Sequence, residues 1–419
     1  MLGLMRMKYK APKGAKDIQP SESYIWQYVE EIAQKIFENA NYSEIRTPLF
    51  EATELFVRGV GDSTDIVNKE MYTFIQKERS LTLRPENTAG IVRAFIEHGM
   101  RRLPTPLKLW YKGAMFRYER PQAGRQRQFH QLGAEIFGIA NPSADAEVIQ
   151  LAMNFLEELG LTELELEINN IGCPECRNEY KNSIKQVIKP KLEDFCPDCK
   201  IRFEKNPMRI LDCKKEKCKA LLTSPELEAV INSEFICEGC VKHFDGLKEY
   251  LEILQINYTL NKKLVRGLDY YNKTVFEITS VNLGAQNAVC GGGRYDPLVA
   301  TLGGVDTPAV GWAIGMERLI SLISPPKKKS FMIFIVSDYT KEALKLAFEL
   351  RKQGISTDID FAGRKFKKQM EKASKSGAKY ALILGENELK SGILTLKNLS
   401  TGEQETISPK EISKKIIEI

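Results

Sequence analysis

Two stretches of the sequence carry polar side chains at alternate positions of a predicted β-strand. Residues 107–118 and 129–139 have the composition of strands and flank a polar loop, RPQAGRQRQ. Because side chains alternate along a strand, Arg117 and Glu119 would share one face of the first strand. Gln131 and Glu135 would share one face of the second, with only Gly133 between them. This arrangement predicts a polar floor with room for a small ligand above the glycine.

Whether this floor is expected to bind a ligand depends on whether its polar side chains are buried. A buried arginine, glutamine or glutamate without a partner costs roughly several kcal/mol, and a bound polar ligand would supply the partners. The alternative is a solvent-facing antiparallel hairpin with ordinary polar residues on its wet side. These residues by themselves leave both interpretations open.

Eight of the nine cysteines lie between positions 173 and 240 and are spaced like metal ligands. Taken in sequence order, the predicted sets are Cys173, Cys176, Cys196 and Cys199, followed by Cys213, Cys218, Cys237 and Cys240. This spacing is typical of tetrahedral zinc–thiolate sites, although other groupings remain open. A reducing compartment disfavours disulfides, and small buried thiols are the other alternative. We expect at least one structural zinc, without Cys290.

The elements that must carry these residues follow from periodicity and turn residues. Helical spacing predicts helices at 24–40 and 146–159, and residues 172–253 are expected to form a mostly helical insertion. SPPKKKS, at 324–330, is typical of a linker, and the short alternating elements beyond it predict a small α/β domain. We therefore expect four segments, 1–171, 172–253, 254–325 and 330–419.

Charge is unevenly distributed along the chain. From Lys327 onwards 19 Lys and Arg face 12 Asp and Glu, whereas the preceding residues hold 42 and 43. Nucleic acid is one partner that this basic part would attract, and a lysine-rich solvated surface is the alternative. The first dozen residues lack the apolar stretch of a signal peptide or a membrane span. We expect a cytoplasmic protein with no membrane partner.

Several segments resemble histidyl-tRNA synthetases, which are class II aminoacyl-tRNA synthetases. The stretch FRYERPQAGRQRQFHQLGAEIFG resembles motif 2, YSEIRTPLFEATELF resembles motif 1, and VGWAIGMERL resembles motif 3. LVRGLDYYNKTVFEI and CGGGRYD resemble two segments peculiar to the histidyl enzymes. The resemblance runs from about residue 11 to residue 419.

The resemblance implies an α+β fold and a defined reaction. An antiparallel sheet flanked by helices would form the catalytic domain from residues 1–171 and 254–325. The mostly helical insertion would interrupt it, and an α/β anticodon-binding domain would follow at 330–419. Motif 1 would build a homodimer. The implied enzyme joins L-histidine to AMP at the expense of ATP, releases pyrophosphate, and transfers the histidyl group to histidine tRNA, with Mg²⁺ neutralising the phosphates.

The resemblance also assigns roles at the nucleotide. Arg117 matches the motif 2 arginine on the α-phosphate, a role that suits a fork of donors with a permanent charge. Arg266 matches a second, histidyl-specific arginine near the same phosphate, and these two are the implied catalytic residues. Glu119, Arg125 and Arg318 match the remaining ATP contacts.

For the amino acid, the resemblance implies contacts from seven residues: Glu86, Thr88, Gln131, Glu135, Arg266, Tyr270 and Tyr271. Glu86, Thr88 and Gln131 would hold the α-amino group, while Glu135 and Tyr271 would accept from and donate to the imidazole. A site that contacts both edges of this ring rejects side chains lacking either group. For tRNA, the implied contacts are Arg120 and Gln122 in the motif 2 loop and Arg364 and Lys365 in the basic C-terminal domain.

Two departures from the family pattern and three rival functions remain. Asn87 stands where a glycine is usual, and KGAKDIQP replaces the common KGTKDILP. The rivals are a histidine-sensing regulatory paralogue, a tRNA-binding protein without catalysis, and a synthetase for another amino acid. The arginines at positions 117, 266 and 318 argue against the regulatory paralogue. The polar floor argues against a tRNA-binding protein without catalysis, and RGLDYY argues against a synthetase for another amino acid.

Overall fold

The computed structural model describes residues 9–417 except 63, 123, 233–234, 281–287, 325 and 327–330. Residues 1–8, on which the signal-peptide prediction partly depends, and five positions of the predicted linker, 325 and 327–330, lie outside the described residues. The chain divides into two units, Met1–Pro325 and Pro326–Ile419. No helix among the described residues combines the length and the apolar character needed to cross a bilayer.

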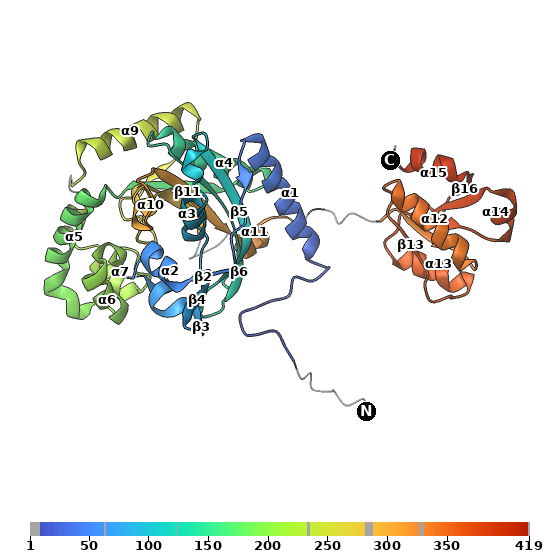
Figure 1. Cartoon of the computed structure of the whole chain (residues 1–419), viewed down its shortest axis with the longest axis horizontal. Coiled ribbons are helices and arrows are strands. Elements are labelled where there is room, and N and C mark those ends of the chain that lie inside the picture. The colour runs from blue at the N-terminus through green and yellow to red at the C-terminus, as the bar shows by residue number, and fades with distance from the viewer. Residues whose placement is uncertain are drawn as a thin grey trace. The chain divides into compact units, whose positions relative to one another are not determined.

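An eight-stranded sheet forms the centre of the first unit (Figure 1), in the order β1-β5-β6-β11-β10-β9-β7-β8. Its strands are β1 (Ser43–Glu44), β5 (Leu107–Phe116), β6 (Gln128–Phe137), β7 (Leu164–Asn170), β8 (Thr259–Leu260), β9 (Asn272–Ser280), β10 (Ala288–Arg294) and β11 (Ala309–Gly315). The two-residue edge strands β1 and β8 pair in parallel, and the six central strands are antiparallel. The predicted antiparallel sheet is therefore confirmed in its centre.

Helices cover one face of this sheet with apolar side chains. The helices are α1 (Ser23–Asn39), α4 (Ser143–Glu158) and α11 (Met316–Leu322). In α1, Val29, Ala33 and Phe37 recur at helical spacing and are fully buried against Trp110. This face is a dry core, which leaves the opposite face for ligands.

The opposite face is built differently, because its strands present Tyr111, Met115 and the polar residues of β6. The elements beside it are α3 (Thr88–Glu97), η2 (Met100–Arg102), α10 (Leu298–Thr301) and α2 (Thr53–Val60) with η1 (Ile66–Glu70). A separate three-stranded sheet, in the order β2-β4-β3, lies beside α2 and comprises β2 (Phe50–Ala52), β3 (Tyr72–Gln76) and β4 (Arg79–Leu83).

The regular elements of the predicted insertion are all helices among its described residues, and it lies at one side of the first unit in Figure 1. Its elements are α5 (Pro174–Ile188), η3 (Lys189–Asp194), α6 (Pro197–Lys205), η4 (Pro207–Ile210), α7 (Glu216–Leu221), α8 (Pro225–Asn232) and α9 (Glu238–Ile253). Buried Tyr180, Ile184, Phe203 and Ile210 give it a small core.

The second unit is a five-stranded sheet with its own core. The strand order is β13-β12-β14-β15-β16, parallel among the first three strands and antiparallel among the last three. Its elements are β12 (Ile333–Val336), α12 (Thr340–Lys352), β13 (Thr357–Ile359), α13 (Phe366–Lys375), β14 (Tyr380–Ile383), α14 (Glu386–Ser391), β15 (Leu394–Asn398), β16 (Gln404–Ile407) and α15 (Pro409–Ile417). The predicted α/β character is confirmed.

Candidate active site

A cavity of about 190 Å³ lies on the polar face of the large sheet. Its walls come from β5, β6, β10 and β11, the start of α3, and the loop before β9. The lining residues are Ile66, Glu86, Thr88, Tyr111, Arg117, Gln131, Glu135, Arg266, Gly267, Leu268, Tyr270, Tyr271, Gly291, Tyr295, Gly311, Trp312 and Ala313. All seven residues expected at the amino acid line this one cavity, together with Arg117.

Glu135 lines the cavity and is only 1% exposed. The Tyr295 hydroxyl donates to its Oε2 at 2.6 Å, and the Thr88 hydroxyl donates to its Oε1 at 2.9 Å. Burial raises the pKa of Glu135 to about 8 despite these two hydrogen bonds, because desolvation outweighs them. A ligand that brings an N–H donor would favour the ionised form.

Glu86 occupies the N-terminus of α3. Its carboxylate accepts from the backbone N–H groups of Thr88 at 2.7 Å and Ala89 at 2.9 Å, which is where a helix stabilises an anion. Burial nevertheless raises the pKa of this carboxyl group. Two further polar atoms of the wall, Gln131 Oε1 and the Tyr111 hydroxyl, are buried without a hydrogen-bond partner among the described atoms. Such atoms are expected to meet a ligand.

The loop RGLDYY supplies the opposite wall. Tyr270 and Tyr271 are buried, and their ring centroids lie 4.6 Å apart. Burial raises the pKa of Tyr271 to about 12, so its hydroxyl remains a donor. Arg266 forms an ion pair with Glu277 of β9. Burial opposes the charge of Arg266, but the Glu277 carboxylate outweighs burial and raises the pKa of the guanidinium.

Two glycines make room for these charged side chains. A Cβ on Gly291 would stand 1.8 Å from Nη2 of Arg266, and a Cβ on Gly311 would stand 1.7 Å from Oε2 of Glu135. Gly291 belongs to CGGGRYD, one of the segments that resemble the family, whereas Gly311 was not singled out from the sequence. The register between β11 and β6, which pairs Gly311 with Glu135, explains why that position is glycine.

The arginine-rich end of the site begins just beyond β5. Arg117 Nε donates to the Pro85 carbonyl at 2.8 Å, and its guanidinium lies over the Phe129 ring at 5.2 Å. Glu119 lies 4.0 Å from Arg117 and accepts from Arg125 at 3.2 Å.

Arg318, at the start of α11, lies beside the motif 2 loop. A Cβ on Gly124 would come within 3.6 Å of its Nε. Burial lowers the pKa of Arg318, and Arg125 lowers it further. The structure thus brings Arg318 and Arg125 together, although Glu119, Arg125 and Arg318 do not line the 190 Å³ cavity.

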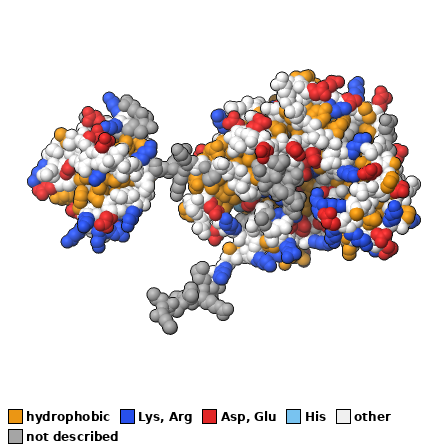
Figure 2. Space-filling view, turned by 180° about the vertical axis from the view of Figure 1, so that it is seen from behind, with side chains coloured by type: hydrophobic (Ala, Val, Ile, Leu, Met, Phe, Trp, Pro, Cys, Tyr) orange, Lys and Arg blue, Asp and Glu red, His pale blue; other side chains and the backbone are white. Residues whose placement is uncertain are grey.

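The residues expected to contact tRNA are distributed over both units. Arg120 and Gln122 are exposed residues of the motif 2 loop, and Gln122 and Arg125 form an isolated antiparallel β-bridge there. Arg364 pairs with Asp360 at 2.6 Å and is about half exposed, and Lys365 precedes α13. Figure 2 shows Lys and Arg side chains gathered along one side of the second unit.

The residues missed by sequence reasoning are mainly Tyr111 and Tyr295. Tyr111 faces Gly133 across the strands, and it lies two positions before Gly113 on the face already considered. Counting back along that strand would have found it. Tyr295 is the tyrosine of CGGGRYD, a segment that was identified only as a whole, by its resemblance to the family.

The eight clustered cysteines form two compact sets, and the grouping in sequence order is wrong. Cys173 and Cys176 meet Cys237 and Cys240, and Cys196 and Cys199 meet Cys213 and Cys218. The sulfur atoms of each set all lie within 4.8 Å of one another. The physical reason is that α5 and α9 begin side by side, which brings Cys173 and Cys176 to Cys237 and Cys240. Along the sequence, the other four cysteines lie between these two pairs. We name them the outer set and the inner set.

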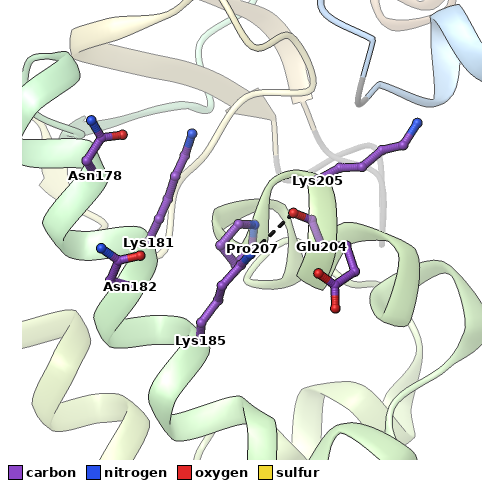
Figure 3. A pocket seen from close by; sticks show the side chains of 7 residues that line it. All are labelled: Asn178, Lys181, Asn182, Lys185, Glu204, Lys205 and Pro207. Carbon is purple, nitrogen blue, oxygen red and sulfur yellow. Dashed lines mark hydrogen bonds between the residues drawn. The ribbon is translucent and has the colours of Figure 1, made fainter.

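Two more cavities are lined wholly or mainly by residues of the insertion. One, of about 390 Å³, is lined by Lys181, Lys185 and Lys205 with Asn178, Asn182, Glu204 and Pro207 (Figure 3). Lys185 donates to the Glu204 carbonyl at 3.3 Å. The other, of about 230 Å³, includes Arg177, Asn206 and Asp269.

Comparison with known proteins covers nearly the whole chain. A family model described as Histidyl-tRNA synthetase matches residues 14–175 and 216–319, and one described as Anticodon binding domain matches residues 322–419. The histidine–tRNA ligase of Acetivibrio thermocellus is 51% identical over 411 residues, covering 96% of this chain and 98% of that protein. The corresponding ligase of Caldanaerobacter subterraneus subsp. tengcongensis is 48% identical over 419 residues, covering 98% and 100%. A crystal structure of apo histidyl-tRNA synthetase from S. aureus has a TM-score of 0.80 and 37% identity, covering 97% and 99%.

Residues 176–215 lie outside the matched ranges of the family model. This segment contains Cys176, Cys196, Cys199 and Cys213, half of the clustered cysteines. The matched ranges therefore include every residue that lines the 190 Å³ cavity but only half of the clustered cysteines.

Proposed function

Because the chain belongs to the histidyl-tRNA synthetase family, we propose that its cavity divides into a histidine half and a nucleotide half. The activity itself is the ATP-dependent ligation of histidine to tRNA. The observation that supports the proposed division is the convergence of Glu135, Gln131 and Tyr271 with Arg117 and Arg266 on one cavity of about 190 Å³.

In the histidine half, Glu135 accepts from the imidazole N–H and Tyr271 donates to the other ring nitrogen. The α-ammonium group is held by Glu86, Thr88 and Gln131, whose buried Oε1 would otherwise lack a partner among the described atoms. Tyr270 closes the wall beside the ring. A polar pocket of this kind rejects isosteric side chains, because they would leave its buried groups unpaired.

In the nucleotide half, negative charge that develops on the α-phosphoryl group meets fixed cations. Arg117 and Arg266 bind the α-phosphate and hold it against the histidine carboxylate, so that positioning and charge lower the barrier. Glu119, Arg125 and Arg318 bind the remainder of ATP.

The reaction uses Mg²⁺ in addition to these arginines. Glu277, a partly exposed carboxylate that contacts Arg266, suits a hard cation that prefers carboxylate and phosphate oxygens. When bound, Mg²⁺ neutralises phosphate charge.

Histidine-dependent exchange of pyrophosphate with ATP, followed by charging of histidine tRNA, tests the function. Arg266→Ala should abolish most of the exchange while largely sparing histidine binding, because the role of Arg266 is charge at the phosphate. Exchange with proline or threonine in place of histidine would contradict the specificity. Equal loss of exchange and of histidine binding in Arg266→Ala would indicate a structural role.

Each cysteine set supports a zinc ion. A zinc–sulfur distance of about 2.3 Å in a tetrahedron places the sulfurs about 3.8 Å apart, whereas a disulfide needs about 2.05 Å. The Cys173–Cys176 and Cys196–Cys213 sulfurs lie 3.4 and 3.9 Å apart. Backbone N–H groups of Cys237 and Cys196 also point at cluster sulfurs, as around bound thiolates. Metal analysis should find two zinc ions per chain. A value near one would contradict one of the two sites, and a value well under one would contradict both.

We assign the tRNA contacts to Arg120, Gln122, Arg364 and Lys365, and the compartment to the cytoplasm, whose reducing conditions keep thiols available. The chain is proposed to act as a homodimer. Phe50 and Phe74 of the three-stranded sheet are 50% and 42% exposed, and their ring centroids lie 6.4 Å apart. They would bury this apolar face against a second copy. Sedimentation at micromolar concentration should give twice the chain mass.

A further inference from the structure

The histidine-binding loop is held on its outer side by two residues of the insertion. Arg177 Nη1 donates to the Tyr271 carbonyl at 2.7 Å and approaches the Asp269 carbonyl at 3.4 Å. Asn206 Nδ2 donates to Asp269 Oδ1 at 2.7 Å. On the inner side, the Asp269 N–H donates to the Val60 carbonyl at 3.1 Å. The backbone that carries Tyr270 and Tyr271 is therefore fixed from both sides.

Arg177 is tied directly to the outer cysteine set. It follows Cys176 in the first turn of α5, and Cys173 is the N-cap residue of that helix. Because a guanidinium presents its donors in a rigid fork, it can hold two carbonyls only if its helix starts in one position. That position is defined where Cys173 and Cys176 meet Cys237 and Cys240.

Asn206 is tied in the same way to the inner set. It is the C-cap residue of α6, a helix of nine residues that begins after Cys196 and includes Cys199. Helices of this length are marginal by themselves and depend on tertiary contacts. Cys199 and Phe203 are the buried residues of α6, so the inner set supplies much of what orients this helix.

We propose that zinc at the two cysteine sets positions the Tyr270–Tyr271 wall of the histidine pocket, acting through Arg177 and Asn206. The metal ions then control affinity for the amino acid without touching it. This inference rests on the proposed function, and it makes Arg177 and Asn206 positioning residues. Metal loss would release the carbonyls of residues 269 and 271 and loosen the donor that meets the imidazole.

The first test removes the connection and leaves every thiol in place. Arg177→Met and Asn206→Ala should each retain two zinc ions per chain and raise the KM for histidine roughly tenfold, the factor expected for a lost hydrogen bond of a charged or buried group. The KM for ATP and kcat in pyrophosphate exchange should change much less. Arg177→Lys should restore part of the loss.

Glu179→Gln is the matched control, because Glu179 is an exposed residue of the same helix. Its KM for histidine in exchange should equal that of the unmodified chain. An unchanged KM for histidine in both folded variants, Arg177→Met and Asn206→Ala, would overturn the inference.

The second test removes metal. Cys237→Ser, at the most exposed ligand, should lower the zinc content to one ion per chain and raise the KM for histidine as Arg177→Met does. The double variant, Cys237→Ser with Arg177→Met, should have a KM for histidine no higher than that of the more affected single variant, because both changes break the same connection. Additive effects, or loss of zinc with an unchanged KM, would overturn the inference. Absence of histidine-dependent exchange in the unmodified chain would instead contradict the proposed function.

Discussion

At the scale of single residues, Glu135 combines a functional demand with a cost to stability. Its carboxyl group is fully buried, and burial raises its pKa to about 8 from an ordinary value of 4.5. Between these two pH values the folded chain holds a proton that the unfolded chain has released. The contribution of Glu135 to the free energy of unfolding is therefore fully present below pH 4.5 and is lost as the pH rises towards 8.

We expect Glu135→Gln to weaken the pH dependence of unfolding. Denaturant titrations at pH 5 and pH 8 should show a smaller fall in the free energy of unfolding than in the unmodified chain, because glutamine does not ionise. Histidine-dependent exchange should fall at the same time. Glu97→Gln, at an exposed carboxylate of α3, serves as the control and should leave the pH dependence unchanged. A Glu135→Gln chain with the original slope would show that Glu135 is ionised at pH 5.

Space around Glu135 leads to a second prediction. Gly311→Ala would place a methyl group 1.7 Å from Glu135 Oε2 and 2.4 Å from the Ala134 carbonyl, so the carboxylate must move. The KM for histidine should rise at least tenfold, which corresponds to about 1.4 kcal/mol. Gly315→Ala, on the same strand but with no atom within 4 Å of the added carbon, should keep its KM. Similar kinetics for the two variants would contradict the proposed packing.

At the scale of elements, the polar face depends on how α4 is joined to β10. Asp145 of α4 and Arg294 of β10 are both completely buried and form an ion pair. His243 of α9 lies 3.4 Å from Asp145. The charge of Arg294 lowers the pKa of Asp145 to about 2 against the opposing effect of burial.

Removing one partner of this buried pair should cost more than removing a surface pair from the same helix. Asp145→Asn is expected to lower the free energy of unfolding by about 3–5 kcal/mol, because Arg294 would remain buried with its charge uncompensated. Glu147→Gln, which breaks a partly exposed pair with Lys108, should cost about 1 kcal/mol or less. Urea titration of both variants checks this difference, and equal losses would contradict it.

Periodicity predicted the elements well where burial is one-sided. The helix expected at 24–40 is found at Ser23–Asn39, and the strands around the polar loop are found within one or two residues of their predicted ends. It could not predict the order of eight strands, which depends on contacts far apart in sequence. It could not predict the cysteine grouping either, since spacing does not say which helices begin side by side.

Most of the polar residues that line the candidate cavity were singled out by resemblance, not by local pattern. Glu135 and Tyr271 come from segments 136 residues apart, and only the fold brings both to one cavity. Tyr295, which donates to Glu135, was missed because a tyrosine beside a glycine run has many ordinary explanations. Its role depends on the register of β10 against its neighbours.

At the scale of the whole molecule, the two units have separate hydrophobic cores. Chemistry at the histidine half and attraction of tRNA by the second unit should therefore be separable. Arg364→Ala with Lys365→Ala should leave histidine-dependent exchange unchanged and raise the KM for tRNA.

Salt dependence measures how many phosphates are contacted. Each lost contact should reduce the slope of log affinity against log salt concentration by about 0.7–0.9, so the double variant should lose about 1.4–1.8. Lys390→Ala, which breaks an exposed pair with Glu386, should retain both the slope and the KM. An unaltered slope in the double variant would exclude these two residues from phosphate contact.

The enclosed arrangement of the two cysteine sets has a consequence for biosynthesis. As the chain leaves the ribosome, the inner set is complete at Cys218, before Cys237 has been made. Inner-set residues Cys196 and Cys218 are separated by 22 positions, whereas Cys176 and Cys237 of the outer set are separated by 61. If the 22-residue loop of the inner set closes first, the loop of the outer set loses less conformational entropy when it closes. Metal loading is thus expected to proceed from the inside outwards, so a nascent chain ending at residue 230 should already capture one zinc ion.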